Sequence, residues 1–312
     1  MTDHAVPAGS APDYPQTLGH PRPLWRLFMT EFWERFAFYG MRWALALYIV
    51  AQFFDGDPSG QGYASRTYGA YLALVYAAAV FGGYVADKVI GYQRSILLGA
   101  LVMAAGLFLI MWPDQDVFLL GLSTVIVGNG LFKPNISSMV GQLYGQGDPR
   151  RDRGFTLFYM GINGGALVAP LVTGWLAAYF SDTPMQQNYK AVFLAAGLGM
   201  LVSLAWFEWG RGELKGVGRP APEQASPVRV IWVAVGCVLA IPLVYLLMAK
   251  AGAIALQWLL SAMFVALSAM LFVEGLREGA VQRDRVIAML IIFAFNVLFF
   301  MFFEQAGSSF NF

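Results

Sequence analysis

Residues 229–249 read RVIWVAVGCVLAIPLVYLLMA and carry no charged side chain after Arg229. A helix needs about 20 predominantly apolar residues to cross the hydrocarbon core of a bilayer. The same length, applied along the chain, predicts nine membrane spans at roughly 25–52, 67–87, 95–113, 116–142, 154–179, 190–209, 229–249, 254–275 and 286–308. The fold class expected from this pattern is an all-α, multi-pass membrane protein.

The composition supports lipid as the solvent of this chain. Of its 312 residues 58% are hydrophobic and only 12% are charged, too apolar for a soluble fold to bury. The apolar composition makes the lipid bilayer the expected partner. A net charge of +1 gives no sign of the clustered basic face that nucleic-acid binding requires. Cys237 is the single cysteine, which excludes a disulfide framework. Both histidines, His4 and His20, precede the first span, and no metal site is expected.

The basic residues between the spans predict the topology, because cytoplasmic loops are enriched in Lys and Arg. With a cytoplasmic N-terminus, the segments on that side hold Arg22, Arg26, Lys88, Arg94, Arg150, Arg151, Arg153, Arg211, Lys215, Arg219, Arg229, Arg277, Arg283 and Arg285. The opposite segments hold only Arg66, Lys190 and Lys250. We therefore predict a multi-pass protein of the cell (inner) membrane with its N-terminus in the cytoplasm.

Polar interruptions divide the chain into five parts. Residues 1–24 are polar and rich in Pro, Gly and Ala, which predicts a disordered cytoplasmic tail. Residues 25–210 hold six spans, and 211–228 form a linker whose glycines and prolines predict mobility. Two nearly uninterrupted apolar spans at 229–277 are expected to face lipid. Residues 278–312 hold the ninth span.

Six ionisable residues lie inside predicted spans, where each costs about 2.5–3.5 kcal/mol even on lenient insertion scales. They are Glu31, Glu34, Arg35, Arg42, Lys133 and Glu304. Three acids and three bases predict mutual neutralisation in one internal cavity. The alternative is that those near span ends, Glu31 above all, extend to the headgroups.

Helical spacing places six residues on one face of the first span, since they recur at steps of three and four: Glu31, Glu34, Arg35, Phe38, Tyr39 and Arg42. Burial raises the proton affinity of a carboxylate, and a neighbouring cation lowers it. A conformational change that brings cations to these acids and removes them would therefore switch protonation. The residues alone thus indicate a proton-driven carrier, whereas no nucleophile–base pair indicates an enzyme.

Five motifs in sequence resemble those of the proton-dependent oligopeptide transporters, a branch of the major facilitator superfamily. Residues 31–40, EFWERFAFYG, match the family pattern E-x-x-E-R-F-x-x-Y-G. The other four are 82–88 (GGYVADK) with Gly91, 128–136 (GNGLFKPNI), 155–163 (FTLFYMGIN) and 303–309 (FEQAGSS). The resemblance covers nearly the whole chain.

This resemblance implies a major-facilitator-type six-helix bundle, two inserted helices as in bacterial members, and the first helix of a second bundle. The implied activity is symport of di- and tripeptides with protons by alternating access, with no cofactor beyond the proton as coupling ion. Position by position, Glu31, Glu34, Arg35 and Glu304 would couple protons, and Arg42 would pair with Glu304 across the bundles. The implied substrate-binding residues are Arg35, Tyr39, Arg42, Tyr76, Lys133, Tyr159 and Asn163.

The chain departs from the family at two points. Phe300 stands where the family usually has Trp, four residues before Glu304. The chain also stops at Phe312, just past the ninth span, so we expect a truncated second bundle and a fragment of the full transporter. Two other functions stay open: a related carrier for another anionic solute such as nitrate, and a membrane assembly fragment that does not transport.

Overall fold

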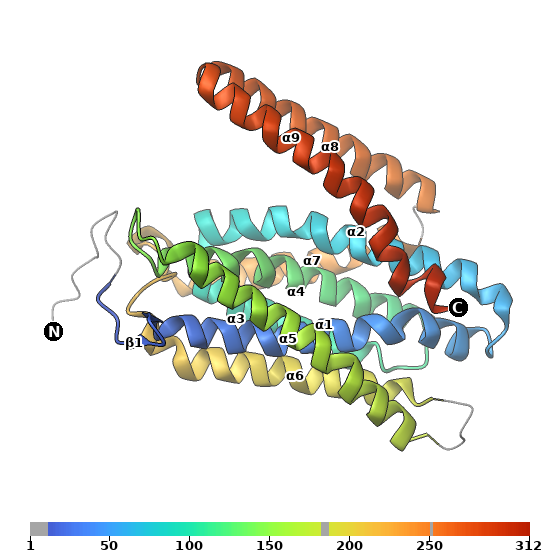
Figure 1. Cartoon of the computed structure of the whole chain (residues 1–312). Helices are drawn as coiled ribbons and strands as arrows, with labels where there is room; N and C mark the ends of the chain where they lie inside the picture. The colour runs from blue at the N-terminus through green and yellow to red at the C-terminus, as the bar shows by residue number, and fades with distance from the viewer. Residues whose placement is uncertain (1–11, 182–186, 250–251) are drawn as a thin grey trace. The chain divides into compact units, whose positions relative to one another are not determined.

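The structure is a computed structural model that describes residues 12–181, 187–249 and 252–312 (Figure 1). Lys250 and residues 1–11 of the predicted tail lie outside these ranges. The chain divides into two compact units, which are described separately below. The first holds residues 1–44 and 74–245, and the second holds residues 45–73 and 246–312.

Each of the nine predicted spans falls on a long helix within the described ranges. These helices are α1 Pro23–Phe53, α2 Gln61–Val85, α3 Tyr92–Leu109, α4 Gln115–Gln142, α5 Arg151–Tyr179, α6 Tyr189–Gly210, α7 Pro227–Ala249, α8 Gly252–Arg277 and α9 Ala280–Phe303. A π-helical turn (Ala86–Ile90) extends α2, and 3₁₀ turns lie at Pro58–Gly60, Arg211–Leu214, Pro222–Gln224, Glu304–Gly307 and Ser309–Asn311. The fold class predicted from apolar length is confirmed.

Small residues let α4 pack closely against its neighbours in the first unit. A methyl group added at Gly99 of α3 would lie 2.7 Å from the carbonyl oxygen of Gly128, and one added at Gly130 would lie 2.7 Å from that of Ala78 in α2. Pro134 has no N–H, so the Gly130 carbonyl lacks its usual helical donor. Backbone contact of this kind is typical of helix packing in membranes and makes α4 a central helix of the unit.

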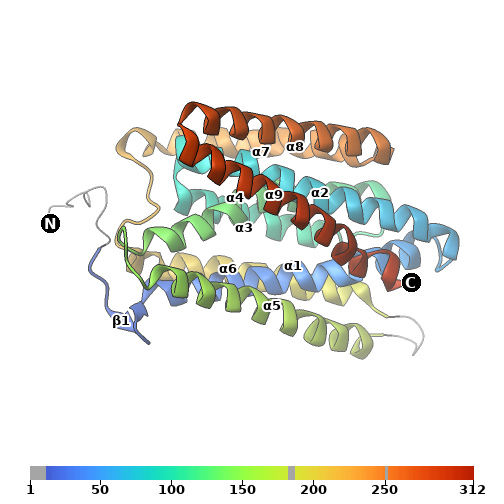
Figure 2. The ribbon, with the colours of Figure 1, turned by 45° about the horizontal axis from the view of Figure 1, so that its top comes forward.

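Helix α5 packs on α1 through a row of small residues. Gly161, Gly165, Ala169 and Thr173 recur every fourth residue and are all buried. A methyl group at Gly165 would lie 2.9 Å from Cβ of Arg35, and one at Gly161 would lie 3.1 Å from a carbonyl oxygen of α1. This close approach brings α5 against the helix that carries the charged motif (Figures 1 and 2).

The segment before α1 differs from the predicted disordered tail. Gln16–Thr17 (β1) pairs antiparallel with His20–Pro21 (β2), with Gln16 opposite Pro21. The Tyr14 hydroxyl donates to the carbonyl of Leu214 at 2.8 Å, and burial raises the pKa of Tyr14 above its usual value. Nδ1 of His20 lies 2.8 Å from the hydroxyl of Tyr144. Residues 14–22 are thus held against the α4–α5 connection and the end of α6.

The linker after α6 also differs from the prediction of mobility. The backbone N–H of Gln93 donates to the carbonyl of Gly218 at 2.9 Å, and its side chain donates to that of Val217 at 2.7 Å. Nε2 of Gln224 donates to the carbonyl of Asp87 at 2.8 Å. Gly216 and Gly218 have φ values of 89° and 75°, so these glycines make turns that bring the linker onto the α2–α3 connection.

The second unit holds the C-terminal end of α1 (residues 45–53), the first half of α2, and α8 and α9. Gly279, with a φ of 101°, separates α8 from α9, and the two helices pack along each other. Glu304 follows α9 and begins the 3₁₀ turn Glu304–Gly307. The predicted lipid-facing character is clearest in α7 of the first unit, where Cys237 is the buried residue and large apolar side chains are exposed.

Candidate functional site

Helix α1 places a compact charged cluster inside the first unit. Glu31, Glu34 and Arg35 are 1%, 0% and 2% exposed, although each carries a full charge when ionised. Arg35 donates from Nε and from Nη2 to the two carboxylate oxygens of Glu34, a two-bond ion pair. Its Nε also lies 3.3 Å from Oε1 of Glu31, one helical turn away. The face of the first span that carries these charges is therefore a buried ion-pair network.

Helix α4 contributes an amide and a cation to the same cluster. Nδ2 of Asn129 donates to Oε1 of Glu34 at 3.2 Å. Lys133 follows one turn later and lies within electrostatic reach of Glu31, Glu34 and Arg35. Its Nζ lies 4.9 Å from the ring centre of Tyr76 in α2. Three helices therefore meet at the charges that the sequence predicts to neutralise one another.

Aromatic rings extend the cluster along α1. The guanidinium carbon of Arg35 lies 4.6 Å from the ring centre of Phe38 and 5.8 Å from that of Tyr39. The guanidinium carbon of Arg42 lies 5.6 Å from the ring centre of Tyr39. Cation–π contacts of this kind stabilise desolvated guanidinium groups. Tyr39 therefore contacts both arginines that the sequence singles out.

The cluster holds more positive than negative charge. Glu31 and Glu34 carry the acids, while Arg35, Arg42 and Lys133 carry the bases, and Lys133 is within electrostatic reach of the other four. Among the described residues, Oε2 of Glu31 is buried without a hydrogen-bond partner. Such an oxygen can accept a hydrogen bond from a donor that enters the site, or it can become protonated. The site can therefore bind an anion at its basic end and a proton at its acidic end.

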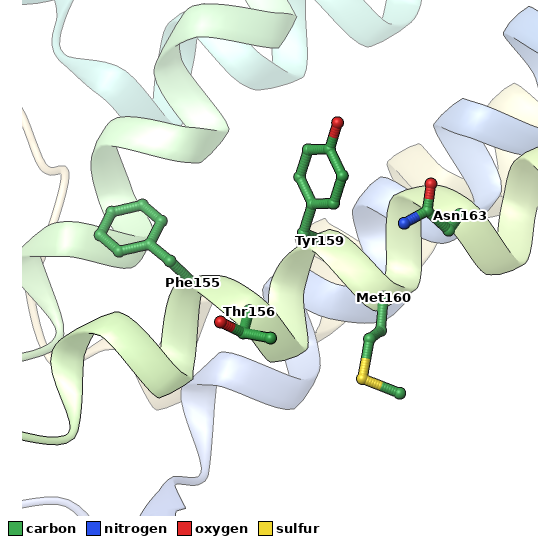
Figure 3. A pocket seen from close by; sticks show the side chains of 5 residues that line it. All are labelled: Phe155, Thr156, Tyr159, Met160 and Asn163. Atoms are coloured by element: carbon green, nitrogen blue, oxygen red, sulfur yellow. The ribbon is translucent and has the colours of Figure 1, made fainter.

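Tyr159 and Asn163 line a separate hollow on α5. The hollow measures about 400 Å³ and is also lined by Phe155, Thr156 and Met160. Figure 3 shows Tyr159 and Asn163 pointing to the same side of the helix, while Met160 points to the other. Tyr159 and Tyr76 are 61% and 51% exposed. Tyr76 thus lies at the charged cluster, whereas Tyr159 and Asn163 line the separate hollow on α5.

Glu304 belongs to the second unit, and Arg42 belongs to the first. Glu304 is half-buried and follows the last residue of α9. The predicted pairing of Arg42 with Glu304 joins the two units and stays a prediction.

Asn129 and Phe38 are members of the cluster that the candidate set derived from sequence omits. Asn129 is fully buried in α4 and lies four residues before Lys133, so the two share a helix face. A polar amide in mid-span, at that spacing from a lysine, is the signal that could have identified it. Phe38 shares the charged face of the first span by its spacing, but an aromatic residue in a membrane helix most often packs against apolar neighbours, so spacing alone does not identify its contact with Arg35.

The fold and this site define a class of protein: a multi-helix membrane protein of the transporter type, with a buried ion-pair network among its helices. The sequence profile of the POT family matches residues 93–312, and the chain belongs to this family. Its members are transporters rather than enzymes. The motif at 31–40 precedes the matched region, but the relatives align with it.

Three comparisons illustrate the likeness. The chain is 36% identical over 299 residues to dipeptide and tripeptide permease A of Chromobacterium violaceum, covering 95% of this chain and 58% of that protein. It is 33% identical to the uncharacterized transporter YclF of Bacillus subtilis, covering 93% and 59%. A crystal structure of a peptide transporter POT in complex with sulfate superposes with a TM-score of 0.74 at 33% identity, covering 96% and 62%. The chain therefore spans about 60% of the length of these relatives.

Proposed function

We propose that this chain contributes to proton-coupled symport of di- and tripeptides across the inner membrane by alternating access. Membership of the POT family and the permease named among its relatives support the transport of short peptides. The observation that carries the proposal is the network of the buried Glu31, Glu34 and Arg35 with the half-buried Lys133. Charges at this depth are costly in a membrane and are retained where they serve a transported ion or solute.

The cluster supplies the two chemical functions that such a symporter needs. A peptide of variable side chain is best held by its constant parts, its carboxylate and its backbone. Arg35, Arg42 and Lys133 suit the carboxylate, and Tyr39 and Tyr76 offer hydroxyls beside those cations. Tyr159 and Asn163 add a hydroxyl and an amide on the accessible face of α5.

Proton coupling follows from competition for the same cations. When a peptide carboxylate engages Lys133, that lysine neutralises Glu31 less well, and the carboxyl group then favours its protonated form. In the same way, Arg42 would release Glu304 when the two bundles separate. Protonation of Glu31 and Glu304 would thus accompany substrate binding and the change of access. We place the N-terminus in the cytoplasm, because the basic residues concentrate on its side.

Uptake of labelled dipeptide by the complete gene product tests the proposal. In membrane vesicles we expect accumulation that depends on an inward proton gradient, that a protonophore collapses, and that Glu304→Gln abolishes. Glu274→Gln is the matched control, since Glu274 is an exposed carboxylate of the same unit. Uptake that persists in Glu304→Gln would remove that residue from the coupling mechanism. A carrier that moves nitrate and ignores competing dipeptides would overturn the assignment of substrate.

A further inference from the structure

A groove lies on the outer face of the first unit, between α3, α6 and α7. Its volume is about 550 Å³, within the range of about 300–1,000 Å³ typical of small-molecule pockets. Its walls are aliphatic: Leu98 and Leu101 from α3, Leu204 from α6, and Val230 and Ile231 from α7. None of these residues belongs to the charged cluster of α1 and α4, so the groove is distinct from the proposed transport site.

The groove opens onto the surface that faces the bilayer. Leu101 and Ile231 are 55% and 61% exposed, and α7 as a whole is hardly buried. Water is absent from the hydrocarbon region, so an aliphatic hollow at this depth is filled by an acyl chain. Leu101 lies two helical turns from Arg94, about 10 Å along the axis of α3, which gives the groove the length of a chain segment rather than of a single methyl group.

Arg94 forms the polar end of the groove. It lies in the first turn of α3, and its Nη1 and Nη2 donate to the carbonyls of Gln224 and Ala225 at 3.2 and 2.8 Å. A guanidinium group has five N–H donors, so capacity remains after these two bonds. In the part of the chain that the structure describes, no carboxylate pairs with Arg94. Its charge is therefore available to an anion.

Two exposed tryptophans mark the depth of this charge. Trp209 near the end of α6 and Trp232 in the second turn of α7 are 73% and 69% exposed. Tryptophan concentrates at the boundary between hydrocarbon and headgroups. Arg94 lies at the same level, because it is in the first turn of α3 and bonds to the linker that joins the end of α6 to the start of α7. A phosphate at Arg94 would therefore be at headgroup level while its acyl chain extends toward Leu101.

We propose that the groove between α3, α6 and α7 binds an anionic phospholipid, with its phosphate on Arg94 and one acyl chain along Leu98, Leu101 and Ile231. The site combines one cation that has no carboxylate partner among the described residues with an aliphatic groove. An anionic phospholipid has the complementary parts, a phosphate that guanidinium groups bind well and an acyl chain. The lipid would also brace the linker, because the Arg94 guanidinium already holds the carbonyls of Gln224 and Ala225.

Native mass spectrometry of the purified full chain tests this site. The protein in mild detergent is offered an equimolar mixture of phosphatidylglycerol and phosphatidylcholine with identical acyl chains. We expect phosphatidylglycerol to be retained about five-fold over phosphatidylcholine, the preference that one basic side chain at a membrane surface confers. Arg94→Gln should reduce this preference to near parity. Arg153→Gln removes an equal charge from an exposed site on α5 and should leave it unchanged.

Two further variants separate the site from a structural role of Arg94. Arg94→Lys keeps the charge and should retain most of the preference. If it behaves like Arg94→Gln, the arginine acts only on the linker and the proposal is overturned. Leu101→Trp leaves the guanidinium in place but fills the groove. The amount of phosphatidylglycerol that the protein retains should therefore fall at least as far as it does in Arg94→Gln. Equal retention of both lipids by the unaltered chain, or displacement of the lipid by excess glycerol phosphate, would also overturn the proposal.

Discussion

Helices α4 and α7 of the first unit are both long and apolar enough to span a membrane, but they differ in what they bury. In the most apolar window of α4, 72% of residues are buried, against 6% in α7. Yet α7 is the more apolar of the two helices. In a soluble protein the more apolar helix would be inside. The reversed order is expected when lipid is the solvent, because apolar side chains are then satisfied at the surface.

The residues that distinguish α4 from α7 are small or polar. Gly128 and Gly130 let α2 and α3 approach its backbone, and Asn129 and Lys133 contribute to the buried cluster with α1. Helix α7 carries large aliphatic and aromatic side chains instead. A helix therefore becomes central in this unit through close backbone contact and polar interactions. The following predictions test this difference between the interior of the unit and α7.

The largest effect is expected from Arg35→Met. This substitution keeps an extended side chain but leaves Glu34 and Glu31 buried without the guanidinium that pairs with both, and breaking a buried ion pair typically costs about 3–5 kcal/mol of folding free energy. Arg229 at the start of α7 is half-buried and lies outside the ion-pair network, so Arg229→Met should cost at most about 1 kcal/mol. Thermal unfolding of the purified protein in detergent, followed by size-exclusion chromatography, measures both.

A double variant shows whether the unpaired carboxylate is the cause. Adding Glu34→Gln to Arg35→Met removes one buried charge, and we expect part of the lost stability to return because the two residues interact directly. If the double variant is less stable than Arg35→Met by the full effect of Glu34→Gln alone, the two side chains act independently and the buried network is not the reason.

A matched pair of glycines tests close packing. At Gly165 an added methyl group meets Cβ of Arg35 at 2.9 Å, whereas at Gly236 of α7 nothing lies within 4 Å. Gly165→Ala should therefore cost about 1–3 kcal/mol through overpacking. Gly236→Ala should be neutral or stabilise by up to about 1 kcal/mol, because alanine has the higher helix propensity. The same melting experiment applies, and two equal melting temperatures would contradict the role assigned to the small residues of α5.

The smallest effect concerns a partly exposed ion pair. Nη2 of Arg150 lies 2.7 Å from Oδ2 of Asp148, and hydrogen bonds from the Arg150 side chain and backbone lower the pKa of Asp148 to about 2. Because this pKa is below the value of about 3.9 for an unfolded chain, the pair stabilises the fold above about pH 4 and loses that contribution as the pH falls toward 2.

The difference in melting temperature between the wild type and Asp148→Asn measures this contribution. It should be small at about pH 7 and should shrink at about pH 2.5, where the aspartate of the wild type is itself becoming protonated. A difference that grows on acidification would mean that the pair does not stabilise the folded chain.

The helices and the charged face of α1 could be predicted because each depends on local spacing. Apolar runs of sufficient length located nine helices, and steps of three and four placed Glu31, Glu34 and Arg35 together. The start of α2 at Gln61 was predicted six residues late, because the 3₁₀ turn Pro58–Gly60 leads into the helix across a polar stretch. Local polarity marks where a span could end, whereas hydrogen bonding decides where the helix begins.

The sequence could not predict that residues 12–22 and the linker have a defined structure, since that structure depends on partners distant in sequence. Tyr14 bonds to Leu214, His20 to Tyr144, and Gln93 to Gly218. The composition of both segments is that of flexible chain, and only these distant partners hold them in place. The place of Asn129 in the cluster depends in the same way on how α4 lies against α1.

The sequence by itself determined that this protein crosses a membrane, how many long helices its described ranges form, and which charges would have to be inside. These follow from the cost of placing polar groups in hydrocarbon, which each span meets alone. Only the tertiary structure decided that Asn129 bonds to Glu34, that Gly165 packs on Arg35, and that Arg94 ends an aliphatic groove. Such contacts depend on which two helices approach each other closely. A small residue in the sequence allows a close approach but does not indicate which helix will make it.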